Sequence, residues 1–238
     1  MDNILSRLVD SDFCPDKQHP YYIVRSILYR IVLSFSKCVS GRILDFGCGR
    51  GPYRSLFGSC EYLAVDFPNT GHPEHEKQID VYWDGLRLSF ADNSFDYVLF
   101  TEVIEHLFEP THVLVELHRV LKPGGKLLLT TPFIWELHET PYDYARYTPF
   151  GLGHIAKQVG FKVHEENKHG TTLDVVLSIL MAISLRNMAG KPLMGLGNRI
   201  LNVILNSLSS VARLNDTINR TGNHSGYYLV NEFILIKE

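Results

Sequence analysis

The stretch from Arg42 to Pro52, Arg-Ile-Leu-Asp-Phe-Gly-Cys-Gly-Arg-Gly-Pro, constrains this chain more than any other. Its apolar half, Ile43 to Phe46, predicts a buried strand, and the alternating glycines predict a sharp turn at the end of that strand. Glycine accepts positive φ and lets a ligand come close to the backbone. In open α/β sheets, ligands bind at this edge. A short helix beginning near Pro52 would add its N-terminal N–H groups to the same place.

The spacing of the glycines argues against a dinucleotide. A G-x-G-x-x-G fingerprint beginning at Gly47 needs its third glycine at position 52, which is a proline. The observed order is D-x-G-x-G-x-G, with Asp45 two residues ahead of Gly47. A carboxylate beside the loop suits a cationic ligand better than a phosphate. This pattern resembles motif I of the class I S-adenosylmethionine-dependent methyltransferases, whose cofactor is a nucleoside with a cationic amino-acid tail.

Further carboxylates follow the next apolar runs. Glu61 to Asp66 reads as a second strand, and Asp66 lies about twenty residues after the loop, as an acid that accepts from both ribose hydroxyls would. In the family, an acid ahead of an "LPF"-like segment contacts the adenine amino group. Leu88-Ser89-Phe90 resembles that segment, with Ser89 in place of the proline. Its spacing favours Asp84 as the acid, and Asp80 is the alternative.

The middle of the chain is similar to the family's "EHL…RVLKPGG" segment almost letter for letter. Phe95 to Phe100 predicts a third strand, and Thr111 is expected to cap a helix that runs to Leu121. Lys122 to Gly125 predicts a turn, and Lys126 to Thr131 a fourth strand. With motif I, the resemblance covers roughly residues 40–165.

The resemblance implies an α/β fold, a Rossmann-like, mostly parallel seven-stranded sheet with helices on both faces. We expect a single domain, with an N-terminal helical lead-in over 1–39, a cofactor-binding core over 40–168, a helical insertion over 169–225 and a final strand over 226–238. The implied cofactor is S-adenosyl-L-methionine. The residues expected to bind it are Asp45, Gly47, Cys48, Gly49, Asp66, Phe67, Asp84, Thr101 and Glu102.

Two histidines are candidates for a general base. Methyl transfer from a sulfonium is an in-line displacement, so an enzyme contributes mainly alignment, plus a base where the nucleophile is a neutral hydroxyl. His106 follows a strand at the ligand edge, and imidazole titrates near neutrality. His138 is the second candidate. A structural histidine that pairs locally is the other reading of His106.

Glu102-x-x-Glu105-His106 resembles the metal-binding E-x-x-E-H of two metal-dependent branches, the ubiquinone-pathway O-methyltransferases and the small-RNA 2′-O-methyltransferases. Carboxylates with an imidazole suit Mg²⁺ or Mn²⁺, and His138 could supply a fourth ligand. The same letters occur in metal-free relatives, where Glu102 approaches the cofactor. We therefore expect no metal.

The segment from Pro132 to Thr148 is both aromatic and charged and follows a strand end. We expect it to form the substrate wall. Its "HE-x-P-x-D-x-x-R-Y-T" pattern is similar to methyltransferases of polysaccharide and surface-glycan pathways. Asp143 and Arg146 could pair with each other or bind acceptor groups. The residues expected to contact the substrate are Tyr142, Tyr144, Arg146 and Tyr147.

The flanking segments predict helices and two further strands. Pro20 to Lys37 has helical apolar spacing. Thr148 and Pro149 predict the start of a helix, which ends before Gly160, and a strand follows over 161–165. Thr171 to Arg186 is apolar on nearly every face, and Arg199 to Leu214 is amphipathic, with Ile204 and Leu208 opposite Asn202, Asn206 and Ser209. These helices could cap the pocket, form a dimer surface or contact a membrane peripherally.

The composition indicates which cellular compartment and which binding partners to expect. A net charge of −3 gives no reason to expect nucleic acid, and four cysteines without a C-x-x-C pattern predict neither zinc nor disulfides. The opening twelve residues carry charges and resemble no cleavable signal, so we expect a cytoplasmic protein. Three functions stay open: an enzyme that methylates a hydroxyl on a sugar, lipid-linked glycan or quinone-like acceptor, a cofactor-binding subunit without catalysis, and an oxidoreductase, which Pro52 disfavours. The sequence does not indicate an oligomeric state.

Overall fold

The computed structural model describes residues 17, 19–68, 78–188, 195–218 and 226–238. Residues 1–16 and 18 of the expected lead-in over 1–39, and residues 189–194 and 219–225 of the expected insertion over 169–225, lie outside the described residues. The chain divides into two compact units. One comprises Met1–Ile31 and Lys168–Leu229, and the other comprises Val32–Asn167 and Val230–Glu238.

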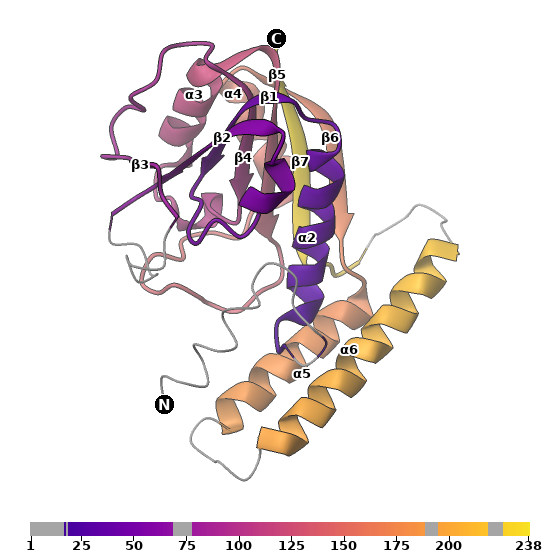
Figure 1. The fold of residues 1–238 in the computed structure, drawn as a ribbon. Coiled ribbons are helices and arrows are strands. Elements are labelled where there is room, and N and C mark those ends of the chain that lie inside the picture. Colours follow the sequence, from indigo (N-terminus) through magenta and orange to yellow (C-terminus); the bar gives the residue numbers. More distant parts are fainter. Residues whose placement is uncertain (1–16, 18, 69–77, 189–194, 219–225) are drawn as a thin grey trace. The chain divides into compact units, whose positions relative to one another are not determined.

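A seven-stranded sheet forms the frame of the chain (Figure 1). The order of its strands is β3-β2-β1-β4-β5-β7-β6. The pairs β1–β2, β1–β4, β2–β3 and β4–β5 are parallel, whereas β5–β7 is antiparallel. This order confirms the predicted Rossmann-like fold. The strands are β1 Gly41–Phe46, β2 Cys60–Asp66, β3 Val81–Tyr82, β4 Phe95–Thr101, β5 Leu121–Pro132, β6 Phe161–His169 and β7 Val230–Lys237.

The helices follow the apolar periodicity closely. Thr148 caps α4 as predicted, because its hydroxyl accepts a hydrogen bond from Gly151 N at 3.1 Å, and Pro149 occupies the first turn. Gly160 follows with φ 97°. The described helices are α2 Tyr22–Ser36, η1 Arg54–Phe57, η3 Ile104–His106, α3 Pro110–Val120, α4 Pro149–Gln158, α5 Thr172–Met188 and α6 Gly195–Ile218.

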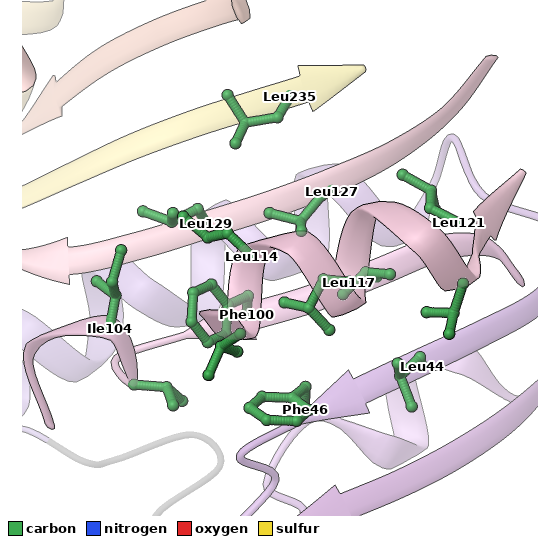
Figure 2. Close-up of a cluster of buried hydrophobic side chains, with 14 of the residues drawn as sticks. Leu44, Phe46, Phe100, Ile104, Leu114, Leu117, Leu121, Leu127, Leu129 and Leu235 are labelled. Atoms are coloured by element: carbon green, nitrogen blue, oxygen red, sulfur yellow. The ribbon is translucent and has the colours of Figure 1, made fainter. Parts of the chain in front are cut away.

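Apolar side chains from the central strands and from α3 form the core, which fixes the edge where ligands bind (Figure 2). Leu44 and Phe46 of β1 and Phe100 of β4 belong to the same buried cluster as Leu114 and Leu117 of α3. Each full burial of such a side chain stabilises the fold by about 1.5–3 kcal/mol. The strands that carry the glycine loop and Thr101 are therefore held rigidly.

Two local predictions were wrong, and a third was confirmed. Lys122 to Gly125 is not a separate turn but a bulge within β5, since Phe95 pairs with Leu121 and Tyr97 already pairs with Lys126. Thr111 does not cap α3, because Pro110 already occupies the first helical position and Glu109 precedes it. The short helix after Pro52 is the 3₁₀ helix η1.

Arg119 is the centre of a polar network that joins α3 to the segment before β4. Its guanidinium donates to Glu116 Oε2 at 2.8 Å, to Asp92 Oδ1 at 2.6 Å and to the carbonyls of Leu88 and Phe90 at 3.0 and 2.8 Å. Glu116 in turn accepts from Leu88 N at 3.0 Å. Hydrogen bonds from Arg119 hold the pKa of Glu116 below its usual range, against a smaller opposing effect of burial. The network fixes the loop that carries Asp84.

Replacing Arg119 should therefore destabilise the fold. We expect Arg119→Met to lower the free energy of unfolding by about 3 kcal/mol, because it leaves Glu116 largely buried and unpaired. Urea denaturation measures the change. Arg87→Met is the matched control, because Arg87 is exposed and reaches Asp92 only at 3.8 Å, so its loss should cost under ~0.5 kcal/mol. Equal losses in the two variants would contradict this role of Arg119.

The polar face of α6 is the buried one. Asn206 is fully buried and donates to the carbonyl of Lys17 at 2.8 Å, and Ser209 donates to the buried carboxylate of Asp174 in α5. On the other face, Ile204 and Leu208 are exposed. Several apolar side chains of α5 are exposed as well: Leu173, Val176, Ile179, Leu180 and Ile183. Peripheral membrane contact through these helices stays a prediction. In the described part of the chain, none of the helices has the length and apolar character that crossing a bilayer requires.

Candidate cofactor and acceptor site

The glycine loop begins where β1 ends, and its conformation leaves no room for a side chain at Gly47. Gly47 has φ 76°, and a Cβ added there would lie 2.3 Å from Cγ2 of Val103. Gly49 has φ 52°. The N–H groups of Gly47 and Cys48 donate to the carbonyl of Val65 at 2.8 and 3.2 Å, which anchors the loop on β2. The loop is thus a rigid backbone surface at the ligand edge of the sheet.

Asp66 lies directly beside this loop, as the sequence predicted. Its Oδ2 accepts from Gly49 N at 2.8 Å, and its Oδ1 accepts from Phe67 N at 2.7 Å. These two bonds orient the carboxylate. A carboxylate accepts at two oxygens, which suits a ribose diol, and this contact stays a prediction.

Asp45 is almost completely buried, and the hydroxyl of Tyr62 donates to its Oδ2. Burial raises the pKa of Asp45 to about 7, the Tyr62 hydrogen bond opposes this rise, and the nearby Asp66 carboxylate adds to it. Sequence reasoning missed Tyr62. Parallel pairing of β1 with β2 could have indicated it. Tyr62 pairs with Ile43, two residues before Asp45, which pairs with Ala64.

The two candidates for the adenine acid differ in their surroundings. Asp80 is engaged, because its Oδ2 accepts from Ala64 N at 2.8 Å and from Arg54 at 2.5 Å. Asp84 is exposed, and its Oδ1 accepts only a local bond from Leu86 N at 2.8 Å. Asp84 therefore has the freer carboxylate, and its adenine contact stays a prediction.

Two buried carboxylates follow β4. Thr101 ends the strand, and Glu102 has the positive φ of 54°, a strained conformation that is concentrated at functional sites. Burial raises the pKa of Glu102 to about 7. Burial also raises the pKa of Glu105 well above its usual range, and Glu102 adds to that rise. Glu105 Oε2 accepts from Thr131 at 3.1 Å, whereas its Oε1 has no hydrogen-bond partner among the residues that the structure describes.

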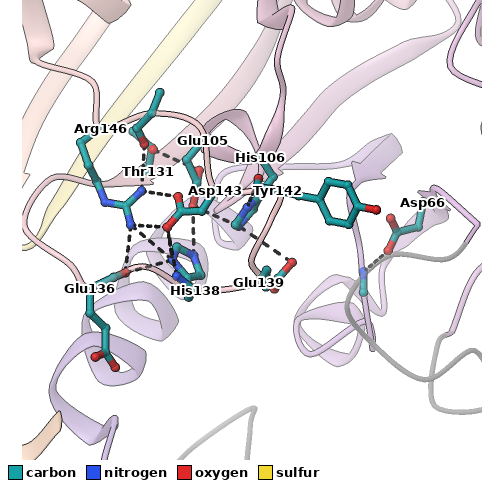
Figure 3. A network of polar contacts seen from close by, with 12 residues as sticks. Asp66, Glu105, His106, Thr131, Glu136, His138, Glu139, Tyr142, Asp143 and Arg146 are labelled. Carbon is teal, nitrogen blue, oxygen red and sulfur yellow. Dashed lines mark hydrogen bonds and ion pairs between the residues drawn. The ribbon is translucent and has the colours of Figure 1, made fainter. Parts of the chain in front are cut away.

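His106 and His138 meet beside Glu105 (Figure 3). Their rings are 4.7 Å apart, and both Nε2 atoms face Glu105 Oε1, at 3.8 Å from His106 and 3.9 Å from His138. His106 Nδ1 lies 3.0 Å from the carbonyl of Tyr142, which can only accept, so this nitrogen carries the proton. Burial lowers the pKa of His138, and the neighbouring His106 contributes. The structure thus brings the two predicted bases together.

Asp143 and Arg146 form the pair that was one of the two predicted alternatives. Arg146 donates to Asp143 Oδ1 at 2.5 Å and Oδ2 at 2.7 Å, and to the carbonyl of Glu136 at 2.9 Å. Burial raises the pKa of Asp143, but the stronger combined effect of Arg146 and the His138 backbone N–H lowers it to about 2. This pair folds the segment 136–146 back on itself.

The predicted substrate tyrosines lie differently. Tyr142 and Tyr144 are both about half exposed, whereas Tyr147 is partly buried, and its carbonyl accepts from Asn231 at 3.0 Å. In Figure 3 the ring of Tyr142 points away from the histidine pair. Phe108, which sequence reasoning missed, is 79% exposed and packs edge-to-face on Tyr144 at 5.6 Å. Its position directly after the "EHL" segment could have indicated from the sequence that it belongs to the site.

Comparisons with known proteins agree with this geometry. Residues 44–129 match a family model described as a methyltransferase domain, of type 11. That range contains the glycine loop, Asp66 and the Glu102–His106 segment.

Curated relatives match the same core. The chain is 31% identical over 105 residues to a ubiquinone/menaquinone biosynthesis C-methyltransferase of Desulfotalea psychrophila, covering 39% of this chain and 43% of that protein. It is 28% identical over 139 residues to a ubiquinone biosynthesis O-methyltransferase of Xanthomonas oryzae, covering 54% of this chain and 56% of that protein. The chain thus spans about half the length of the curated relatives it matches.

Solved structures share the fold. A SAM-dependent methyltransferase from Archaeoglobus fulgidus superposes with a TM-score of 0.57 at 18% identity, covering 98% of this chain and 99% of that one. The [4+2]-cyclase SpnF superposes with a TM-score of 0.58 at 16% identity, covering 100% and 94%. At these identities the likeness shows the fold alone. The family match therefore identifies residues 44–129 of this chain as a methyltransferase domain of type 11, within the Rossmann-like fold that the chain shares with these solved structures.

Proposed function

We propose that this protein transfers the methyl group of S-adenosylmethionine to a hydroxyl oxygen of a small-molecule, glycan or lipid-linked acceptor. The observation that carries the proposal is the pair of imidazoles at the edge of the sheet where the glycine loop lies. Val103, whose side chain packs on Gly47, stands three residues before His106, so loop and histidines belong to one neighbourhood. A neutral hydroxyl needs a base at that place.

The residues divide into two groups with different roles. Gly47, Gly49 and Asp66 form the surface for the cofactor, which supplies an activated methyl group when bound. His106 and His138 direct unprotonated Nε2 atoms at a common space, where one of them can take the proton of the acceptor hydroxyl. Glu105 lies beside both imidazoles; burial raises its pKa, and in its ionised form it would stabilise the positive charge that this imidazole then carries.

A labelled-methyl assay tests the proposal. The purified protein is incubated with S-adenosylmethionine carrying a tritiated methyl group and with polar, glycan and lipid extracts of the source cells. We expect alkali-stable label in one extract with the wild-type protein and at least tenfold less with the double variant His106→Gln, His138→Gln. Cofactor binding without any transfer would favour the alternative of a catalytically inactive cofactor-binding subunit.

The exposed ring of Tyr144 should matter for the acceptor and not for the cofactor. We expect Tyr144→Ala to lower kcat/KM at least tenfold, about 1.4 kcal/mol, because its face and that of Phe108 offer a platform for a sugar or planar acceptor. Turnover, cofactor affinity and melting temperature are measured on the same variant. Tyr227→Ala, which removes a tyrosine that is also exposed, is the control. A parallel loss of cofactor affinity and melting temperature would make Tyr144 structural.

A second candidate function is metal-dependent O-methylation, and one observation favours it. Among the described residues, Glu105, His106 and His138 each direct one ligating atom to within 4.8 Å of the others. With Glu105 ionised and both Nε2 atoms unprotonated, all three atoms are acceptors, a set that a cation can join. Two imidazoles and one carboxylate suit a divalent transition ion such as Zn²⁺ or Mn²⁺, whose bonds of about 2.1 Å would draw the three atoms slightly closer. Such an ion would acidify a bound hydroxyl. This candidate opposes the metal-free site expected from the sequence.

Metal titration separates the two candidates. If the metal site exists, the EDTA-treated protein should bind one Mn²⁺ or Zn²⁺ per chain in equilibrium dialysis, and Glu105→Gln should weaken binding at least tenfold. His164→Gln is the control, because His164 is exposed on β6, outside this cluster. Methyl transfer that persists in EDTA, with no bound metal, would reject this candidate and leave the imidazole base in place.

A further inference from the structure

His138 lies in a segment without regular secondary structure, yet its ring is held at Nδ1 on the side away from Glu105. Nδ1 lies 3.2 Å from Asp143 Oδ2 and 3.3 Å from the carbonyl of Glu136. Both of these atoms can only accept. The opposite nitrogen, Nε2, faces Glu105 Oε1 at 3.9 Å.

Asp143 is an unusual residue for an exposed loop, because its side chain is only 1% exposed. It accepts from the backbone N–H of His138 at 3.0 Å and from both terminal nitrogens of Arg146 at 2.5 and 2.7 Å. Three donated bonds fix the carboxylate, so it cannot turn away from the imidazole. The charge of Arg146 also keeps it ionised.

From this arrangement we propose that Asp143 is the positioning residue for His138, holding it in the Nδ1–H tautomer so that Nε2 is the basic nitrogen aimed at the acceptor. The inference deepens the proposed function and rests on it for the acceptor. Asp143 itself touches no reacting atom in this scheme. The sequence predicted that Asp143 either pairs with Arg146 or binds the acceptor. In the structure its carboxylate pairs with Arg146 and also lies beside Nδ1 of His138.

The neighbouring donor Arg146 also bears on which ring nitrogen of His138 carries the proton. Arg146 lies 3.4 Å from His138 Nδ1, and a guanidinium can only donate. If Nδ1 accepted from Arg146, the proton would sit on Nε2 instead. The distances favour the other arrangement, because both acceptors are closer to Nδ1 than Arg146 is, and because Arg146 already donates to Asp143 and Glu136. An Nδ1-bound proton satisfies the most partners.

His106 offers an independent parallel. Its Nδ1 also faces an acceptor, the carbonyl of Tyr142 at 3.0 Å, and its Nε2 also points at Glu105. The two rings, one at the end of η3 and the other in the segment after β5, are therefore both held at Nδ1 and present Nε2 to the same space. Of the two, only His138 has a carboxylate beside its Nδ1, whereas Nδ1 of His106 faces a backbone carbonyl.

Nuclear magnetic resonance reads the tautomer directly. Two-bond couplings between ring protons and ring ¹⁵N distinguish the two forms, and the signals of His138 are assigned by their loss in His138→Gln. At pH 8 we expect the wild-type His138 to be Nδ1–H, and Asp143→Asn to convert most of it to Nε2–H. Asp96→Asn, which removes another carboxylate paired to a cation, is the matched control and should leave the tautomer unchanged.

The outcomes are distinct. A wild-type His138 protonated on Nε2 overturns the inference, and this measurement needs no variant to fold. An unchanged tautomer in a folded Asp143→Asn would assign the proton to the Glu136 carbonyl and also overturn it. S-adenosylmethionine affinity, measured on the same samples, reports separately on the proposed function. Its absence in the wild-type protein would reject that function, whereas its persistence with the wrong tautomer would reject only the role of Asp143.

Discussion

Gly49→Val is expected to abolish binding of S-adenosylmethionine, while the wild-type chain should bind it with a Kd in the micromolar range, roughly −8 kcal/mol. Gly49 has φ 52°, and a β-branched side chain at positive φ is strained. Its N–H also donates to Asp66, so a shifted backbone would misplace the carboxylate meant for the ribose. We expect at least a hundredfold loss of affinity by isothermal titration calorimetry.

Gly58→Val is the matched control for this experiment. Gly58 has φ −61°, and an added Cβ would meet nothing within 4 Å, so the same substitution should leave affinity unchanged. NAD should not bind to either variant or to the wild-type chain. Preferential binding of NAD to the wild-type chain would overturn the step from the loop to the cofactor.

The second large expected effect is a dependence of cofactor affinity on pH. Burial and Asp66 place the pKa of Asp45 at about 7, against the Tyr62 hydrogen bond, in the free protein. The cofactor carries an ammonium group, whose positive charge favours the ionised carboxylate. Affinity should therefore be high above pH 7 and fall as the pH drops through the Asp45 pKa, by about 20-fold between pH 7.5 and 5.5. Above about pH 8 the α-amino group of the cofactor loses its proton and affinity should decline again.

Calorimetry with S-adenosylhomocysteine, which keeps the same ammonium group, measures this dependence across the range. Asp45→Asn mimics the protonated carboxyl, so it should bind weakly and with little change between pH 5.5 and 7.5. Tyr62→Phe removes the hydrogen bond that favours the ionised form, so its affinity should begin to fall at a higher pH than in the wild-type protein. A wild-type affinity that stays flat over this range would show that Asp45 does not sense the cofactor charge.

The cofactor half of the site could be predicted from the sequence because its residues are close together along the chain. Glycines 47 and 49 follow a short apolar run, and the conformations they adopt are ones that only glycine adopts readily. Asp66 ends the next strand, and parallel pairing of adjacent strands brings it to the loop. The chemistry of neighbouring residues and the apolar pattern of the strands therefore suffice to predict the cofactor half of the site.

The acceptor half was only partly predictable. The sequence placed His106 and His138 at strand ends, but it did not show that their Nε2 atoms converge on Glu105. That convergence depends on the Glu105 carbonyl, which accepts from Tyr144 N at 2.9 Å, and on the Asp143–Arg146 pair. The bond from Tyr144 to Glu105 joins residues far apart in the chain, and no periodicity encodes it.

By itself, then, the sequence determined where the central strands lie along the chain, the glycine loop and the carboxylate after the next strand, since apolar period and glycine spacing act locally. Only the tertiary structure decided which face of α6 is buried, because amphipathicity separates two faces but does not choose between them. There Asn206 and Ser209 donate hydrogen bonds in the interior, and Ile204 is left exposed. The tertiary structure likewise decided that Asp143 faces an imidazole, since a carboxylate between two partners is placed by packing and not by its neighbours in sequence.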